Sequence, residues 1–201
     1  RLLLIARGAK RPGSTLRGML MPFVPLKLSW TGRKEAKVLT RAEWLGILPP
    51  LRGEALLSGF YVNELLMRLT EREDIHPGLF PAYVRVIEAL THSDPAAQQR
   101  GLRRFEADLL RICGWQVLIS EGGDAPRFTL RSTGDLAGVS GSFGNEIRTW
   151  ERRDVLDVLE GRLERPEALR AAREIYREAI ELRLDGRPLK TRRVLAELKR
   201  L

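Results

Sequence analysis

Residues 54–69 read EALLSGFYVNELLMRL, the longest stretch of the chain with a strongly apolar helical pattern. Apolar residues recur on most sides of a helix with about 3.6 residues per turn, a pattern typical of a helix that is buried by its neighbours. Glu64 stands four residues before Arg68, a spacing that permits an ion pair within one helix. The stretch therefore predicts a central, buried helix.

Two further helices are expected after this stretch. One follows His76-Pro77, and the next starts at Asp94-Pro95, where a capping acid precedes a proline at the first helical position, and ends at Gly114. Their apolar stripes contain Leu79, Phe80, Tyr83, Val84, Ile87 and Leu90 in the first helix and Leu102, Phe105, Leu109 and Ile112 in the second. Three amphipathic helices in succession predict a helical bundle.

Residues 115–149 interrupt the helical pattern, because they are rich in Gly, Ser and Thr. The segment Phe128–Leu130, followed by a turn at Gly134-Asp135, predicts a small hairpin that leaves the bundle as an excursion.

Helical spacing returns in the last fifty residues. It resumes at Val155 and again after Pro166, until Asp185-Gly186 stops the helix. A short basic helix that ends at Leu201 is expected to follow. The bundle therefore extends to the end of the chain.

The first fifty residues follow the spacing of β-strands instead. Leu2–Ile5 is a short apolar run, and residues 26–40 alternate on either side of Thr31-Gly32-Arg33, which predicts a hairpin. Between them lies a glycine-containing loop, residues 7–14, whose glycines let the backbone approach a ligand while three bases face it. Three strands are too few to close a barrel.

The chain starts inside an apolar run and without a methionine, so we expect its natural N-terminus to be missing. The missing strands would complete a small OB-type barrel, a fold that binds oligonucleotides. The expected fold class is α+β. An N-terminal OB-type β-barrel, incomplete in this chain, occupies residues 1–50, and an α-helical bundle domain with the small excursion at 115–149 occupies residues 51–201.

Positive charge is concentrated at the two ends of the chain. The first fifty residues hold ten Lys and Arg against two acids, which is +8 of the formal net charge of +9. Residues 184–201 hold six bases against two acids, and the middle of the chain carries 19 bases against 22 acids. This distribution indicates a polyanion-binding arm attached to a separate scaffold, with an incidentally basic surface as the alternative.

The sequence contains few groups suited to catalysis. His76 and His92 stand at helix boundaries, and the lone Cys113 excludes an internal disulfide and a cysteine-rich zinc site. No phosphate-binding loop, dinucleotide motif, metal-ligand spacing or apolar run of about 20 residues occurs. We therefore expect a cytosolic protein that is not an enzyme. An active site assembled from dispersed residues such as Glu64, His76 and Glu106 is the remaining alternative.

Four blocks of sequence carry a family resemblance. They are Ala6–Lys10 with Ser14–Gly18 and Pro22-Phe23; Gly59–Leu66; Leu102–Glu106 with Leu109-Leu110 and Gly114-Trp115; and Gly186–Arg192. Their order and spacing cover almost the whole chain. In these blocks the chain resembles the bacterial RecO family of DNA repair proteins, which are recombination mediators.

The resemblance implies an OB domain and a helical domain that bind single- and double-stranded DNA and anneal complementary strands. It implies RecR and the acidic, Phe-ended tail of single-stranded DNA-binding protein as partners, and RecA indirectly, because RecA is loaded onto coated strands. It implies no covalent reaction, no cofactor and no membrane, and a location in the bacterial cytoplasm with the nucleoid. Some relatives carry a cysteine zinc site in the region matching 115–149; this chain has no cysteine there, so zinc is expected to be absent.

The DNA-binding surface is expected in the basic first fifty residues. Such bases neutralise phosphates and release counterions, so binding is independent of base sequence and weakens with salt. The expected phosphate contacts are Arg7, Lys10, Arg11, Arg17, Arg33, Lys34 and Lys37. Trp30 and Phe23 are candidates for stacking on bases, but both fall on the apolar face, so burial in the barrel core is the favoured interpretation for each.

Two other basic groups complete the expected sites. The resemblance puts the contact to the acidic tail at Arg103, with Arg104 as the alternate; the two diverge by about 100° around a helix, so one of them is expected to face the tail. A second basic patch contains Arg187, Lys190, Arg192 and Arg193. The alternative function for the whole chain is an RNA- or ribosome-associated basic helical interaction protein.

Overall fold

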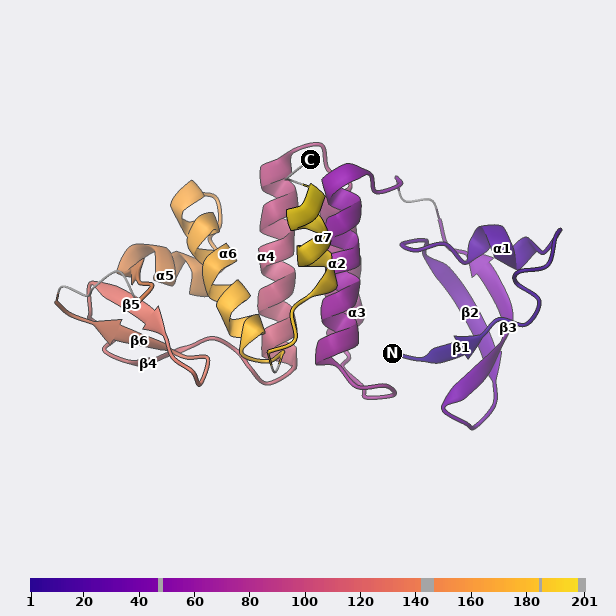
Figure 1. Cartoon of the computed structure of the whole chain (residues 1–201), viewed down its shortest axis with the longest axis horizontal. Coiled ribbons are helices and arrows are strands. Elements are labelled where there is room, and N and C mark those ends of the chain that lie inside the picture. Colours follow the sequence, from indigo (N-terminus) through magenta and orange to yellow (C-terminus); the bar gives the residue numbers. More distant parts are fainter. Residues whose placement is uncertain (47–48, 142–146, 185, 199–201) are drawn as a thin grey trace.

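The computed structural model describes residues 1–46, 49–141, 147–184 and 186–198 (Figure 1). A small sheet near the N-terminus lies beside a layer of helices, and a second small sheet lies at the far end of this layer. The expected mixture of helices and strands is confirmed, while the described residues close no barrel.

The first sheet contains β1 (Leu3–Ile5), β2 (Leu26–Thr31) and β3 (Ala36–Trp44), in the order β1-β3-β2. β2 and β3 are antiparallel, which confirms the predicted hairpin, although β3 continues past the predicted end at Thr40. β1 pairs with β3 in parallel, an arrangement that the alternation of residues does not reveal. A short helix, α1 (Thr15–Met19), follows the predicted loop and lies against β3.

The two aromatic residues expected in a barrel core lie elsewhere. Trp30 is on β2, beside an irregularity in the β2–β3 register, and is 45% exposed. The barrel-core interpretation is wrong for Trp30, because no described strand covers its face of the sheet. Phe23 is half-buried with a left-handed φ of 65°, and it packs edge-on against Phe60 with 5.3 Å between the ring centroids. Phe23 therefore joins the sheet to the helices.

The three predicted helices are confirmed as α2 (Gly53–Leu69), α3 (Leu79–Leu90) and α4 (Pro95–Ile112). The Asp94 side chain caps α4 as predicted, since its two oxygens accept hydrogen bonds from the first free backbone N–H groups of the helix at 2.9 and 3.0 Å. Gly114, just beyond the end of α4, has a left-handed φ of 78° that ends the helix.

The buried faces of these helices are narrower than the predicted stripes. Phe80, expected to be buried, is 73% exposed, and Ala82 and Val86 take the buried positions on α3. α2 is central but not covered on all sides, since Met67 is exposed. A prediction made from apolar residues alone exceeds the observed burial wherever neighbouring elements cover only part of the helix circumference.

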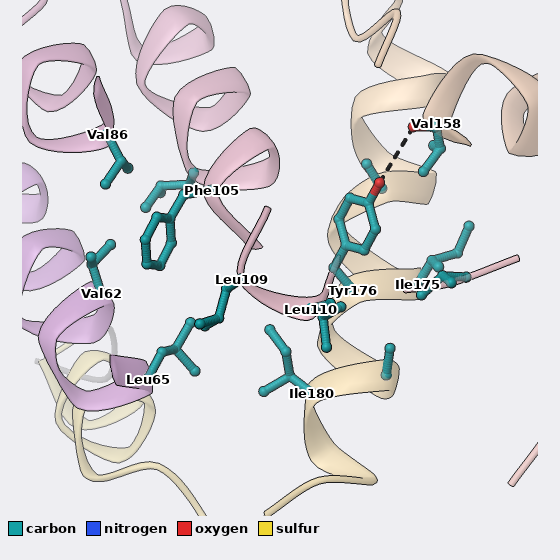
Figure 2. Packing of buried hydrophobic residues seen from close by; sticks show 14 of the residues in the cluster. Val62, Leu65, Val86, Phe105, Leu109, Leu110, Val158, Ile175, Tyr176 and Ile180 are labelled. Atoms are coloured by element: carbon teal, nitrogen blue, oxygen red, sulfur yellow. Dashed lines mark hydrogen bonds between the residues drawn. The ribbon is translucent and has the colours of Figure 1, made fainter. Parts of the chain in front are cut away.

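The core lies on both sides of α4 (Figure 2). On one side, Phe105 meets the buried residues of α2 and α3. On the other side, Leu110 meets Tyr176 and Ile180 of α6 (Pro166–Glu181). Leu110 is fully buried, and burial of such a side chain contributes roughly 1.5–3 kcal/mol. Because α4 contacts α2, α3 and α6, it holds the two sides of the core together.

The second sheet has the strand order β4-β6-β5-β7. Its strands are β4 (Ile119–Glu121), β5 (Arg127–Leu130), β6 (Leu136–Val139) and β7 (Trp150–Glu151). β5 and β6 are antiparallel, which confirms the predicted hairpin. Phe128 and Trp150 are buried in the same core as the helices, so this sheet extends beyond the predicted limit at residue 149 and contributes to the packing.

The remaining helices are α5 (Arg152–Leu159) and α7 (Lys190–Leu198). α5 ends before Leu163, which is nevertheless buried in the core. α6 ends at Glu181, before the predicted stop at Asp185-Gly186; Asp185 lies outside the described residues. The predicted basic helix is confirmed as α7, and its predicted end at Leu201 also lies outside the described residues.

Specific contacts join the first sheet to the helices. The Arg1 guanidinium donates two hydrogen bonds to the Thr70 carbonyl, at 2.8 and 3.1 Å. A Cβ on Gly59 would stand 2.9 Å from the Phe23 ring, so only glycine fits there without movement. Two ion pairs also cross the junction, Lys37–Glu73 and Arg72–Glu35. The division into domains at residue 50, between β3 and α2, stays a prediction.

Candidate nucleic-acid interface

The basic loop between β1 and α1 is held by consecutive turns. The backbone N–H groups of Arg11, Ser14 and Arg17 each donate to the carbonyl three residues earlier, at 3.0 to 3.1 Å. Gly8, with a left-handed φ of 73°, is the third residue of the preceding turn, in which the Ala9 N–H donates to the Ala6 carbonyl at 3.3 Å. These turns satisfy much of the backbone inside the loop. Arg7, Lys10 and Arg11 of this loop are exposed, and so is Arg17 on the following helix α1.

The other predicted phosphate contacts lie at the opposite end of the sheet. Arg33 and Lys34 are exposed in the turn between β2 and β3, whereas α1 lies at the end where β2 begins (Figure 1). Lys37 follows on β3, but its side chain is only 15% exposed and forms an ion pair with Glu73. The structure therefore separates the predicted phosphate contacts into a loop group and a hairpin group. Lys37 differs from both groups, because it already forms an intramolecular ion pair.

Arg103 and Arg104, the candidates for the acidic tail, occupy different environments on α4. The Arg103 side chain is 7% exposed, and it donates to Glu106, which is 1% exposed, at 2.8 Å. Arg104 is exposed and stands 3.6 Å from Glu164. The predicted divergence of the two side chains is confirmed, and Arg104 is the one whose guanidinium is open to solvent.

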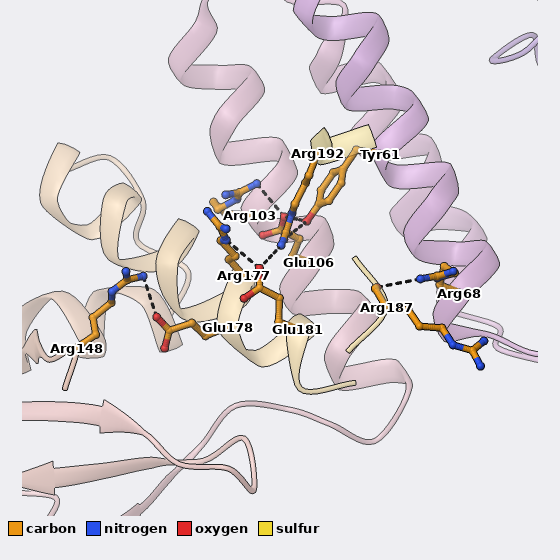
Figure 3. A network of polar contacts seen from close by, with 10 residues as sticks. All are labelled: Tyr61, Arg68, Arg103, Glu106, Arg148, Arg177, Glu178, Glu181, Arg187 and Arg192. Carbon is orange, nitrogen blue, oxygen red and sulfur yellow. Dashed lines mark hydrogen bonds and ion pairs between the residues drawn. The ribbon is translucent and has the colours of Figure 1, made fainter. Parts of the chain in front are cut away.

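Glu106 is the centre of a polar network that joins four helices (Figure 3). Tyr61 of α2 donates to the same Glu106 oxygen at 2.6 Å. Arg192 of α7 lies over the Tyr61 ring, 5.5 Å from its centroid, and pairs with Glu181 of α6 at 2.6 Å. Burial, followed by the negative charge of Glu106, raises the pKa of the Tyr61 hydroxyl, so Tyr61 stays protonated and remains a donor.

Three members of the second basic patch, Arg187, Arg192 and Arg193, line an open groove of about 510 Å³ between the end of α6 and the start of α7. Arg187 and Arg193 are exposed in it, while Arg192 is held by Glu181 and Tyr61. Lys190, the remaining predicted member, is also exposed. The groove thus combines exposed guanidinium groups with buried apolar residues beneath them.

Glu64 of α2 fixes the start of α7. Its carboxylate accepts hydrogen bonds from the backbone N–H groups of Lys190 and Thr191, at 2.8 and 2.9 Å, and from the Thr191 hydroxyl at 2.7 Å. The Glu64 side chain therefore caps the N-terminus of a helix that lies far away in the sequence. Its predicted ion pair with Arg68 is not formed; Arg68 donates to the Arg187 carbonyl instead, at 2.9 Å.

We expect Glu64→Gln to loosen α7 and to lower the free energy of unfolding by about 1 kcal/mol at neutral pH. Partial burial by itself would raise the pKa of Glu64, but the hydrogen bonds from Thr191 and Lys190 outweigh it and lower this pKa. The stabilisation is therefore complete above the ordinary pKa of a glutamate and is lost as the pH falls below about 4.

Urea unfolding measured at about pH 7 and about pH 3 checks this expectation. The difference between parent and Glu64→Gln should shrink at the lower pH. Glu88→Gln, an exposed acid on α3 that forms no ion pair with a described residue, is the matched control and should change little. A difference that is equal at both pH values would contradict the capping role.

The remaining titratable candidates are held apart in separate contacts. His76 stands 3.0 Å from Asp74, Glu64 caps α7 and Glu106 lies in the helical core. Burial raises the pKa of the Cys113 thiol, with a further contribution from Asp74, which disfavours a reactive thiolate. Within the described part of the chain, no group of three or more His, Cys, Asp or Glu side chains is arranged to hold a metal ion.

No described helix combines the length and the apolar composition needed to cross a membrane.

Comparisons with known proteins identify the class to which this arrangement belongs. Residues 51–124 match a family model described as "Recombination protein O C terminal". The whole chain is 40% identical to a DNA repair protein RecO of Ralstonia nicotianae, covering 75% of it, and 41% identical to that of Aromatoleum aromaticum, covering 85%. A RecO of Cupriavidus metallidurans is 39% identical over the whole chain, which covers 69% of it.

This is a protein of DNA repair and recombination. The chain belongs to the RecO family. The match of the family model begins at Leu51, where β structure gives way to helices.

Sequence reasoning missed the acidic residues that engage these bases. Glu73 binds Lys37, Glu181 binds Arg192 and Glu106 binds Arg103, and only the last pair has a helical i, i+3 spacing that could have revealed it. The other two pairs join residues from different elements, so no local pattern contains them.

Proposed function

We propose that this chain binds single- and double-stranded DNA, anneals complementary strands and, with RecR, helps to load RecA onto strands coated by single-stranded DNA-binding protein. One observation carries the proposal: the three basic side chains of the loop between β1 and α1, together with Arg17 of α1, are exposed, and none of the four forms an ion pair with a described residue. Membership of a DNA repair family supports DNA as the polyanion. The proposed location is the bacterial cytoplasm, with the nucleoid.

Annealing follows from contacts that do not depend on base sequence. Lysine and arginine side chains that neutralise phosphates reduce the electrostatic repulsion between two DNA strands. They do so whatever the base sequence of either strand. The exposed ring of Trp30 supports a stacking contact to an unpaired base, because every base offers a π-face. We regard the three-stranded sheet as part of an OB-type barrel, a fold whose strands and loops bind oligonucleotides.

Strand annealing tests this proposal. Two complementary labelled oligonucleotides should pair faster with the chain than without it, and a non-complementary pair should not. The same reaction with strands coated by single-stranded DNA-binding protein tests whether this partner is engaged. An RNA-only binder, the alternative function, would leave DNA pairing at its uncatalysed rate.

We further propose that the acidic tail of single-stranded DNA-binding protein binds beside α4. Recognition of such a tail requires a cation for its carboxylates next to apolar surface. Arg104 is exposed and only loosely paired with Glu164, which supports it as the contact, whereas Arg103 already has Glu106 as its partner. Arg103 would then support the helix from within.

We expect Arg104→Ala to weaken binding of a labelled tail peptide about tenfold, because a hydrogen-bonded charge pair is lost. Fluorescence anisotropy measures the affinity. Arg111→Ala removes the same charge from an exposed position near the C-terminal end of α4 and should have little effect. Equal affinities of the Arg104→Ala variant and the parent would refute this contact and leave the proposal for DNA intact.

A further inference from the structure

We infer that Glu73 competes with DNA phosphate for Lys37, so that the loop between α2 and α3, residues 70–78, limits the DNA affinity of the first sheet. The inference rests on the proposed DNA binding and adds an internal competitor to it. Of the seven predicted phosphate contacts, Lys37 alone forms an ion pair with a described residue. It is also the least exposed of them, at 15% of its side chain.

The backbone of the loop holds Glu73 in position. The Glu73 N–H donates to the Arg1 carbonyl at 3.0 Å, and Glu73 adopts a left-handed φ of 62°, which is unfavourable for a residue with a side chain. The Arg1 guanidinium in turn donates to the Thr70 carbonyl. Strained backbone persists only where its surroundings enforce it, and here the result is a carboxylate presented to Lys37.

A second ion pair also attaches the loop to the sheet, so the Lys37–Glu73 pair can be removed without detaching the loop. Arg72 pairs with Glu35, which stands two residues before Lys37. The two pairs have opposite polarity, since the loop supplies a cation to Glu35 and an anion to Lys37. Neutralising Glu73 therefore removes one pair and leaves the loop attached through the other.

Phosphate can replace Glu73 because the pair is not deeply buried. Glu73 is 48% exposed, and a partly exposed ion pair is weak and screened by salt. A strand bound along the exposed bases would bring several phosphates toward the sheet at once. The free energy needed to break the Lys37–Glu73 pair then lowers the net free energy of DNA binding. Glu73 is therefore a determinant of the affinity for DNA.

We expect Glu73→Gln to bind a labelled single-stranded oligonucleotide about threefold to fivefold more tightly at low salt. The slope of log affinity against log salt should steepen by up to about 0.7, the value for one additional phosphate contact on a single strand, because Lys37 then contacts phosphate in every complex and not only in those where the pair has broken. Anisotropy titrations over a series of salt concentrations measure both quantities, and urea unfolding verifies that each variant is folded.

Two further variants separate release of Lys37 from a general change of charge. Glu71→Gln makes the same charge change in the same loop, but Glu71 forms no ion pair with a described residue, so the gain should be smaller. In a Lys37→Met background, the gain from Glu73→Gln should fall to that of Glu71→Gln. Equal gains from the two glutamine variants, or a full gain without Lys37, would overturn the inference. Absence of DNA binding by the parent would contradict the proposed function itself.

Discussion

Replacing Arg7, Lys10 and Arg11 together with alanine is expected to weaken DNA binding more than any other change to the first sheet. The three bases lie in one exposed loop, so a bound strand loses up to three phosphate contacts at once. The slope of log affinity against log salt should fall by about 2 for a single strand and by nearly 3 for a duplex. At physiological salt this corresponds to a loss of at least about tenfold in affinity.

The matched control removes the same charge elsewhere. Arg153, Arg170 and Arg173 are exposed on α5 and α6, and none forms an ion pair with a described residue. Their replacement with alanine should leave the salt slope nearly unchanged. If both triple variants changed the slope equally, binding would depend on net charge alone, and the loop would lose its assigned role.

Glu106→Ala is expected to destabilise the fold by about 3–5 kcal/mol, because it leaves the buried Arg103 guanidinium without its partner. It also removes the acceptor of the Tyr61 hydroxyl. Because the network joins four helices, the loss should appear as a lower urea midpoint for the whole helical layer. Circular dichroism at increasing urea concentration measures it.

Replacing the network as a unit provides the control. A triple variant, Tyr61→Phe with Arg103→Met and Glu106→Leu, removes both charges together with the hydroxyl. Its stability should lie much nearer to the parent, because apolar residues of similar volume often substitute for a buried ion pair without loss. A Glu106→Ala variant within about 1 kcal/mol of the parent would show that Arg103 finds solvent or another partner.

The helices were predictable because their evidence is local. Residues 54–69 and the Asp94-Pro95 cap contain the periodicity and the terminus of their own helices, and both predictions agree with the structure. Phe80 differs from the prediction, since its exposure depends on which neighbours cover α3. The parallel pairing of β1 with β3 was missed for the same reason: it depends on a partner more than thirty residues away.

The candidate site divides in the same way. Exposure of the loop bases follows from their position among glycines and turns, which the sequence contains. The burial of Arg103 and the engagement of Lys37 depend on acids that the fold brings to them. Sequence alone therefore identifies which segments are basic, whereas the three-dimensional partners decide which of their charges are available.

The capping of α7 by Glu64 also affects the order of events during biosynthesis. The two halves of this contact, Glu64 and Lys190, are 126 residues apart. At translation rates of roughly 5–20 residues per second, Lys190 is made about 6 to 25 s after Glu64. α2 can form early, but the side of it that α7 covers stays bare on the nascent chain throughout that interval. Completion of the helical layer therefore waits until α7 has been synthesised.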